Sequence, residues 1–180
     1  QLLHETNIKA SQLNAVAVTS GPGSYTGLRV GMASAKGLCF GLNIPLITLP
    51  TTEVMCVAAL QQLSANDSFL LAPMIDARRM EVFTALYTQS IQTVKEPHAC
   101  ILQTDSFNEL LQEQILYFFG NGAEKWKTLC SHSNARFLNA NWSAADMVVA
   151  AFTKFQQKDF AYLAYAATFY GKDFHSTAKN

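Results

Sequence analysis

Short apolar runs alternate along the chain with amphipathic stretches, and turn residues separate most of them. The runs at residues 14–20, 44–49 and 115–119 are rich in Val, Ile, Leu and Phe, which is typical of buried strands. Helical spacing of apolar positions predicts helices between these runs and after them. The predicted strands are residues 14–20, 44–49, 69–75, 81–88, 98–103 and 115–119, and the predicted helices are residues 1–8, 27–42, 51–64, 106–112 and 143–157, with one more around Trp126.

Residues with capping preferences mark the limits of these helices. Asn43 is expected to end the first long helix, and the hydroxyl of Thr51 is expected to cap the next one. Thr104 or Asp105 is expected to cap the short helix that follows the hairpin, and Ser143 the last helix, which has the clearest amphipathic pattern. The apolar stripe predicted for that last helix comprises Met147, Val148, Ala151, Phe152 and Phe155.

A strand followed by a glycine turn and a helix occurs in both halves of the chain, after Ser20 and after Phe119. This order predicts an α/β fold, here in two lobes. The turn residues at 66–68 separate the halves. We therefore expect a first lobe at residues 1–65, a second at 66–158, and a C-terminal segment at 159–180 that returns to the first lobe.

The composition describes a chain that buries a core and carries no excess charge. It has 180 residues, of which 49% are hydrophobic and 12 are Phe, with 13 basic and 13 acidic side chains. A protein that binds nucleic acid on its own normally needs a basic face, because phosphate neutralisation supplies most of the affinity. Direct, tight binding of RNA or DNA by this chain alone is therefore not expected.

The four cysteines are widely spaced and form no C-x-x-C pair. This spacing favours free thiols in a reducing compartment over a disulfide framework or a zinc site. No apolar run reaches the roughly 20 residues that span a bilayer, so a soluble, cytoplasmic protein is expected. The chain opens at Gln1, without Met and inside a predicted helix, and we expect it to be a fragment.

The segment SGPGSYTGLR at residues 20–29 is the first candidate site, because N–H groups at a helix N-terminus attract anions. A phosphate loop requires Lys directly after its last glycine, and here Leu28 follows. The glycine spacing is also one residue too long for a dinucleotide-binding motif. A structural role, in which glycines let strand and helix cross closely, stays open. The residues of this turn and helix start are Gly21, Gly23, Ser24, Thr26, Gly27 and Arg29.

The helix after this turn contains glycines at helical spacing, including the pair Gly37 and Gly41. An interior glycine costs about 1 kcal/mol of helix stability relative to alanine. The helix therefore needs close packing on some face, either against its own sheet or against another protein. The residues expected on the partner-facing side, with the face itself left open, are Gly31, Met32, Ala35 and Lys36.

The segment SGPGSYTGLRVGMASAKGL resembles the signature of the bacterial TsaB (YeaZ) family, and IDARRMEV at residues 75–82 resembles its second signature. LITLPTTE, FFGNGAEKW and SAADMVVAAF fit the same family in the same order. The resemblance implies an actin/Hsp70-like (ASKHA) two-lobed fold. It also implies an incomplete first lobe, because the hairpin and most of the first helix that open family members are absent. The C-terminal segment keeps Tyr170 and Lys172 but departs from the family pattern around them.

The resemblance further implies a non-catalytic scaffold in the threonylcarbamoyladenosine modification of tRNA next to the anticodon. In that family TsaD carries the metal-binding histidines and transfers the threonylcarbamoyl group, while TsaE supplies ATPase function. The implied partners are TsaD in a heterodimer, TsaE in a larger complex, and a second copy when the protein is alone. Contact with tRNA is expected to be indirect, and no cofactor, metal or membrane is expected.

The residues themselves single out little for catalysis. The four histidines are scattered without an H-x-x-x-H pair, and no G-x-S-x-G nucleophile motif is present. Trp126 and Trp142, together with the Phe-rich helix at residues 143–157, are expected in the core rather than at a ligand platform. The densest charged cluster is Asp76, Arg78, Arg79 and Glu81, which is either a solvated hairpin turn or a polar contact at a cleft or partner surface.

Two other functions stay open. The glycine turns after Ser20 and Phe119 allow an ATP-binding or ATP-hydrolysing enzyme of the actin/Hsp70/sugar-kinase superfamily. A peptidase is the weaker alternative, suggested by an old label of that superfamily, and no residue stands out as its nucleophile.

Overall fold

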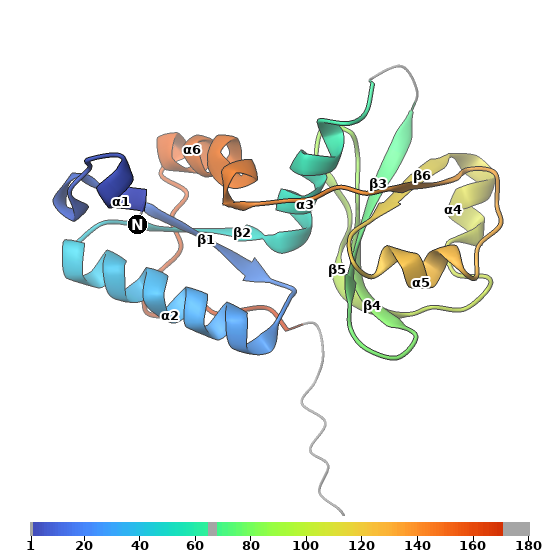
Figure 1. The fold of residues 1–180 in the computed structure, drawn as a ribbon, viewed down its shortest axis with the longest axis horizontal. Helices are drawn as coiled ribbons and strands as arrows, with labels where there is room; N and C mark the ends of the chain where they lie inside the picture. Colours follow the sequence, from blue (N-terminus) through green and yellow to red (C-terminus); the bar gives the residue numbers. More distant parts are fainter. Residues whose placement is uncertain (1, 65–67, 171–180) are drawn as a thin grey trace, which may run out of the picture. The chain divides into compact units, whose positions relative to one another are not determined.

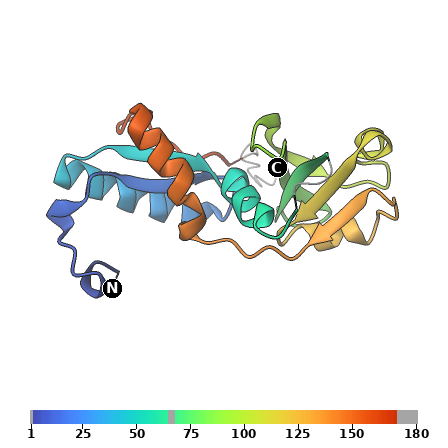
Figure 2. The ribbon, with the colours of Figure 1, turned by 90° about the horizontal axis from the view of Figure 1, so that it is seen from above.

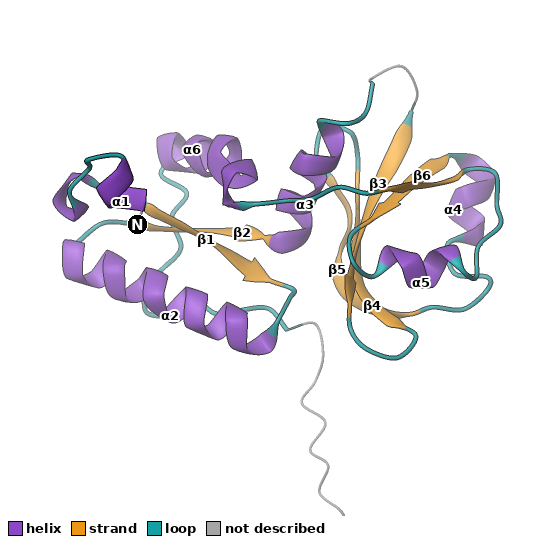
Figure 3. Ribbon diagram, in the orientation of Figure 1, coloured by secondary structure: helices purple, strands orange, loops and turns teal. Residues whose placement is uncertain are grey.

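The computed structural model describes residues 2–64 and 68–170, which form a mixed α/β structure (Figures 1 and 3). The chain divides into two compact units. Unit 1 comprises Gln1–Thr51 and Ala144–Phe169, and unit 2 comprises Thr52–Ser143 and resumes at Tyr170. Of the turn expected at residues 66–68, only Ser68 lies within the described residues. Lys172 lies outside them. The lobe limits expected from the sequence stay predictions.

Unit 1 is built on a two-stranded parallel sheet. β1 (Val16–Gly21) pairs with β2 (Leu46–Pro50), starting with Val16 opposite Leu46. α2 (Tyr25–Leu42) lies along one side of these strands and α6 (Val148–Gln157) along the other (Figures 1 and 2). The short elements of the unit are α1 (Leu2–Glu5), the 3₁₀ helix η1 (Ala10–Gln12) and the 3₁₀ helix η2 (Ala144–Met147).

The segment after α6 completes the core of unit 1. The Ala161 N–H donates to the Leu46 carbonyl at 2.8 Å, so the segment forms an antiparallel bridge to β2. Its apolar side chains join those of α2 and the two strands in one cluster. The members are Met32, Ala35, Cys39 and Leu46, with Val16, Val18, Ile44, Ala161, Leu163 and Ala166 packed against them. Residues far apart in the sequence thus share one small core.

Unit 2 contains a five-stranded sheet in the order β5-β4-β3-β6-β7. β4 pairs antiparallel with both β3 and β5, whereas β6 pairs parallel with both β3 and β7. The strands are β3 (Phe69–Asp76), β4 (Glu81–Tyr87), β5 (Thr93–Ile101), β6 (Ile115–Phe119) and β7 (Ala135–Leu138).

Helices cover both faces of this sheet. α3 (Thr51–Leu60) packs Met55 against the face that carries Leu71. α4 (Asn108–Glu113) and α5 (Ala123–Lys127) pack Leu111 and Trp126 against the face that carries Leu70. Because successive side chains of a strand point to opposite faces, a strand covered on both sides is apolar throughout. This explains the uninterrupted apolar run at residues 69–75 of β3 and the apolar sequence of β6.

Several element limits differ from the sequence predictions. The helix predicted at residues 27–42 begins two residues earlier, whereas its end at Asn43 is confirmed, with Asn43 in a left-handed conformation. The strand predicted at residues 98–103 is β5, which begins at Thr93. The edge strand β7 was not predicted. It is short and contains the exposed Arg136, so it lacks the apolar run that marked the other strands.

Three predicted caps are wrong. Phe107, in a left-handed conformation, stands at the N-cap of α4 in place of Thr104 or Asp105. The Thr51 hydroxyl is buried, and within the described residues it has no hydrogen-bond partner. β2 ends at Pro50 and α3 begins at Thr51, so Thr51 is the first residue of the helix rather than the residue before it. Residues 144–147 form the separate helix η2, and α6 then begins at Val148 with Met147 at its N-cap, rather than at Ser143.

We expect Gly120→Ala to destabilise unit 2 by about 3 kcal/mol or more. Gly120 has φ +97°, which strains a residue with a side chain, and an added Cβ would overlap the Met74 carbonyl and the Met55 methyl group. Urea unfolding followed by tryptophan fluorescence measures the change, because both tryptophans lie in unit 2. The control Gln112→Ala, at an exposed position of α4, should stay within about 0.5 kcal/mol of the wild type. An unchanged unfolding midpoint for Gly120→Ala would contradict this geometry.

Candidate functional site

The turn between β1 and α2 closes on the chain's own backbone. Gly21 has φ +113°, and an added Cβ would overlap the carbonyl oxygen of Phe169. The Phe169 N–H donates to the Ser20 carbonyl at 2.7 Å. An added Cβ on Gly23 would lie 3.7 Å from the Leu28 side chain, an ordinary contact. Gly21 therefore provides the room in which the C-terminal segment of unit 1 approaches the turn.

The first turn of α2 satisfies its own polar groups. The Ser24 hydroxyl accepts from the Gly27 N–H at 3.3 Å, and the Ser24 carbonyl accepts from the Leu28 N–H at 2.8 Å. Arg29 donates to the Tyr25 hydroxyl at 2.7 Å and lies over the Tyr25 ring. Thr26 is exposed. These partners favour the structural role of the turn over the anion site, since an anion would compete for the same N–H and guanidinium groups.

One side of α2 packs on its own unit. Its buried stripe is Leu28, Met32, Ala35 and Cys39. Met32 and Ala35 are 5% and 4% exposed, and an added Cβ on Gly31 would have the Val18 methyl group at 3.9 Å. The expectation that Gly31, Met32, Ala35 and Lys36 face a partner is therefore corrected: these residues face the strands and the C-terminal segment of unit 1.

The opposite side of α2 is exposed and carries no charge. Val30 and Leu38 are 61% and 48% exposed, and an added Cβ at Gly37 or Gly41 would meet nothing within 4 Å among the described residues. The two charged residues of the helix, Arg29 and Lys36, lie seven residues apart and so on one flank. We call this surface the outer face of α2; it comprises Val30, Ala33, Ser34, Gly37, Leu38 and Gly41.

Lys36 fastens the C-terminal segment to α2. Its ammonium group donates to the carbonyls of Ala164 and Ala166, at 3.2 and 3.1 Å. A groove of about 570 Å³ lies here between α2 and residues 162–164. Exposed aromatic side chains border it: Phe40 is 82% exposed, and the rings of Tyr162 and Tyr165 stack at 5.2 Å. The aromatic border continues the apolar surface of the outer face.

The structure brings the charged cluster at residues 76–81 together at the β3–β4 hairpin. The Asp76 carboxylate accepts from the Lys125 ammonium at 2.5 Å and from the Arg78 N–H at 2.6 Å. These hydrogen bonds, the Lys125 bond first, hold the pKa of Asp76 below its usual range. Lys125 also donates to the Glu81 carbonyl at 3.2 Å. Lys125 is the member of this cluster that the sequence analysis missed, because it lies 49 residues from Asp76 along the chain.

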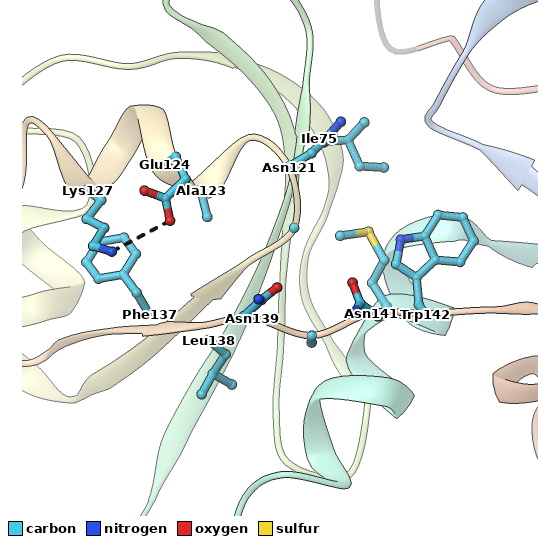
Figure 4. Close-up of a pocket in the computed structure, with 13 residues that line it drawn as sticks. Ile75, Asn121, Ala123, Glu124, Lys127, Phe137, Leu138, Asn139, Asn141 and Trp142 are labelled. Atoms are coloured by element: carbon cyan, nitrogen blue, oxygen red, sulfur yellow. Dashed lines mark ion pairs between the residues drawn. The ribbon is translucent and has the colours of Figure 1, made fainter.

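A pocket of about 770 Å³ opens in unit 2 beside the glycine turn that follows β6 (Figure 4). Phe137 and Lys127 line one end, and Asn141 and Trp142 the other. Lys127, the pocket's cation, lies 3.6 Å from the Glu124 carboxylate. Trp142 is 43% exposed, so its predicted core position is wrong, whereas the predicted core position of Trp126 is confirmed at 0% exposure.

Within residues 2–64 and 68–170 there is no group of three or more His, Cys, Asp and Glu side chains placed to hold a metal ion. None of the helices in the described part of the chain is long and apolar enough to cross a membrane.

The exposed outer face of α2 is the candidate surface that sequence reasoning missed, although the sequence held a signal for it. A helical projection of residues 25–42 places both basic residues on one flank and leaves Val30, Gly37 and Gly41 together on a side without charge. The side that meets the strands had to be known before this one was recognised as exposed.

We expect the Asp76 carboxyl to titrate below the usual range near pH 3.9, and Lys125→Met to raise its pKa. Because the folded state favours the carboxylate, Asp76 stabilises the fold above the pKa of the unfolded chain, and this contribution is lost as the pH falls through the lowered folded pKa. Carboxyl NMR titration of the wild type and the variant measures both values. Lys127→Met is the control, since Lys127 pairs with Glu124 and not with Asp76. An ordinary pKa for Asp76 in the wild type would contradict the contacts.

A family model matches nearly the whole chain, and curated relatives match parts of it. The model of the family described as TsaD, tRNA N6-adenosine threonylcarbamoyltransferase, matches residues 1–173. The tRNA threonylcarbamoyladenosine biosynthesis protein TsaB of Bacillus subtilis (strain 168) is 38% identical over 89 residues, which are 48% of this chain and 35% of that protein. The TsaB protein of Escherichia coli (strain K12) is 29% identical over 136 residues, which are 73% of this chain and 58% of that protein. The chain thus spans less than two thirds of the length of these relatives.

Solved structures agree on the fold. A Pseudomonas aeruginosa protein described as uncharacterized, with similarity to peptidase YEAZ, superimposes with a TM-score of 0.74 at 18% identity, covering 95% of this chain and 79% of that one. A second structure, YeaZ from the same organism, gives 0.72 at 20% identity, with 93% and 79% covered. These matches and the family model indicate an actin-like (ASKHA-type) fold. The chain belongs to the TsaB (YeaZ) family, within the wider family that the threonylcarbamoyltransferase model describes.

Proposed function

We propose that this chain is part of a non-catalytic scaffold that binds TsaD and supports threonylcarbamoyladenosine formation in tRNA next to the anticodon. Support comes from the family, whose curated members are named as biosynthesis proteins of this modification. The proposed complex is a heterodimer with TsaD in the cytoplasm, joined by TsaE in a larger assembly. The surface of this chain that binds TsaD also forms a homodimer when TsaD is absent. The chain contacts tRNA only indirectly.

The outer face of α2 is the observation that carries this proposal. Exposed apolar surface of this kind marks protein interaction sites when it is contiguous and free of charge. Gly37 and Gly41 each lower the stability of α2 by about 1 kcal/mol relative to alanine. Among the described residues, nothing lies within 4 Å of a Cβ added at either glycine, so packing inside the chain does not require a glycine there. A partner helix lying close along this face offsets that cost, because residues without side chains let two helix backbones approach each other.

The chemistry of the titratable groups supports a non-catalytic role. Burial raises the pKa of the Cys56 thiol well above its usual value, and burial also raises the pKa of Cys39 and Cys100. A thiol with a raised pKa carries little of the thiolate that acts as a nucleophile. This disfavours Cys39, Cys56 and Cys100 as the nucleophile of a cysteine peptidase. In the proposed complex TsaD transfers the threonylcarbamoyl group.

ATP binding is the alternative that the glycine turns raised. Basic side chains near the two turns are already paired: Arg29 donates to the Tyr25 hydroxyl, Lys125 to the Asp76 carboxylate, and Lys127 lies 3.6 Å from the Glu124 carboxylate. Phosphate oxygens need such cations or free N–H groups, so the pairing disfavours a phosphate site.

We expect Gly37→Arg to raise the stability of α2 by up to about 1 kcal/mol and to weaken TsaD binding at least tenfold. Arginine is a good helix former, and the position is open in this chain, but its side chain fills the space that a partner helix would occupy. Circular dichroism during heating and calorimetric titration of the full-length protein into TsaD measure the two effects. Gln112→Arg on α4 is the matched control, since it adds the same side chain at an exposed position of unit 2.

The activity assay tests the function itself. Omitting the protein from a reconstituted mixture should reduce threonylcarbamoyladenosine synthesis, and Gly37→Arg should reduce it in parallel with binding. Unchanged synthesis without the protein refutes the proposed function. Wild-type binding by Gly37→Arg refutes the assignment of the interface to the outer face of α2.

We expect no binding heat when the protein is titrated with Mg-ATP at millimolar concentration, because the cations near both glycine turns are paired within the chain. Saturable heat that is lost when Lys127 is replaced by Met would instead support the ATP-binding alternative.

A further inference from the structure

The loop that joins β3 to β4 has a backbone conformation that its residues adopt at a cost. Arg78 and Arg79 have φ +69° and +48°, so two consecutive residues are left-handed although neither is glycine or asparagine. Gly and Asn adopt this conformation with least strain and dominate such turns. Arginine brings no conformational advantage there. We call Arg78, Arg79 and Met80 the arginine loop.

A network of contacts holds the loop in this conformation. The Ala77 N–H donates to the Glu81 carbonyl and the Glu81 N–H to the Arg78 carbonyl, both at 3.1 Å. Directly after β5, the Leu102 N–H donates to the Met80 carbonyl at 2.7 Å. Strained residues persist where their surroundings over-determine them, and such residues cluster at functional sites.

The neighbouring glycine turn and helix add to this network. The Asn121 side chain accepts from the Asp76 N–H at 2.9 Å, and Lys125 bonds both the Asp76 carboxylate and the Glu81 carbonyl. Asp76 and Lys125 therefore neutralise each other while they fix the backbone. The backbone of the loop is ordered before any partner arrives, which lowers the entropy lost on binding.

The side chains of the arginine loop are left available by this arrangement. Arg78 and Arg79 are exposed, and within the described residues neither guanidinium group has a hydrogen bond or ion pair. The Arg78 guanidinium acts on Asp76 through its charge, while the Arg78 backbone N–H donates to the Asp76 carboxylate. Met80, the third member, is 41% exposed. The tip thus presents two adjacent guanidinium groups and one flexible apolar side chain.

We propose that the arginine loop is a second docking surface, on unit 2, for a protein partner whose surface carries at least two carboxylates. Guanidinium groups bind carboxylates through paired hydrogen bonds. Arg and Met are enriched at protein interfaces, where Met fills irregular apolar gaps. A chain with 13 basic and 13 acidic side chains lacks the wider basic surface that an RNA partner needs. The signature residues Asp76 and Glu81 then serve to position the arginines.

The test separates the stability of the loop from its binding. In Arg78→Asn/Arg79→Gly, residues suited to the left-handed conformation replace the arginines, so the melting temperature should rise. Binding should fall at least tenfold at low salt in a calorimetric titration with TsaD, with TsaE, or with both together. Wild-type binding should weaken as salt increases, and binding by the variant should depend less on salt. A purely structural role predicts the opposite pairing, in which a more stable loop binds at least as well.

Matched variants and outcomes complete the design. Arg78→Lys/Arg79→Lys keeps both charges without the paired donors and should bind with intermediate affinity, whereas Lys127→Ala removes a cation elsewhere on unit 2 and should bind like the wild type. The inference rests on the proposed function for its choice of probes. If the wild type binds neither TsaD nor TsaE, the proposed function and the docking surface are both refuted. If the wild type binds and Arg78→Asn/Arg79→Gly binds with the same affinity, the docking surface alone is refuted. Loss of tRNA retention in a filter assay, with protein binding unchanged, overturns it in favour of RNA.

Discussion

The hydrogen bond from the Phe169 N–H to the Ser20 carbonyl is the contact on which unit 1 depends. It brings the segment after α6 to the end of β1, where Gly21 leaves room for the Phe169 carbonyl. Along the way Ala161 bonds β2, and Lys36 holds two further carbonyls of the segment. These polar contacts bury one side of α2 and leave its other side exposed. The surface that we assign to TsaD is therefore selected by the path of the C-terminal segment.

Unit 2 depends on a comparable close approach at the end of β6. Gly120 has a positive φ, and the Gly122 N–H donates to the Met74 carbonyl at 3.0 Å. This places Asn121 against the end of β3 and brings α5, with Lys125, beside Asp76. A glycine turn that resembles a phosphate site in sequence thus orders the neighbouring hairpin. The same turn borders the unit 2 pocket, where Lys127 lies close to Glu124.

The sequence predicted those parts of the fold that bury one or both faces of an element completely. β6 was predicted because helices cover both of its faces and its apolar run is uninterrupted. β7 was missed because an edge strand with the exposed Arg136 needs only the pairing that β6 supplies. The stripe of α6 was predicted to be buried, yet Val148 and Phe152 are 62% and 58% exposed. An amphipathic pattern predicts that the apolar face of a helix is buried, but it does not predict which segment packs against that face.

For the candidate surfaces, the residue types were visible in the sequence, while their orientation was not. In the sequence, Gly37 and Gly41 stood out by spacing, and Arg78 and Arg79 by charge. Only the backbone geometry shows that each pair lowers the stability of the fold. In a chain optimised for its own stability, alanine would stand in the open helix positions and asparagine or glycine in the left-handed loop. At both places the residue present is less favourable for the local backbone than a simple replacement, and within the described residues its side chain makes no hydrogen bond or ion pair that the replacement would lose. We propose that interactions with partner proteins favour the residues present, which is why these two surfaces, on separate units, carry the functional proposals.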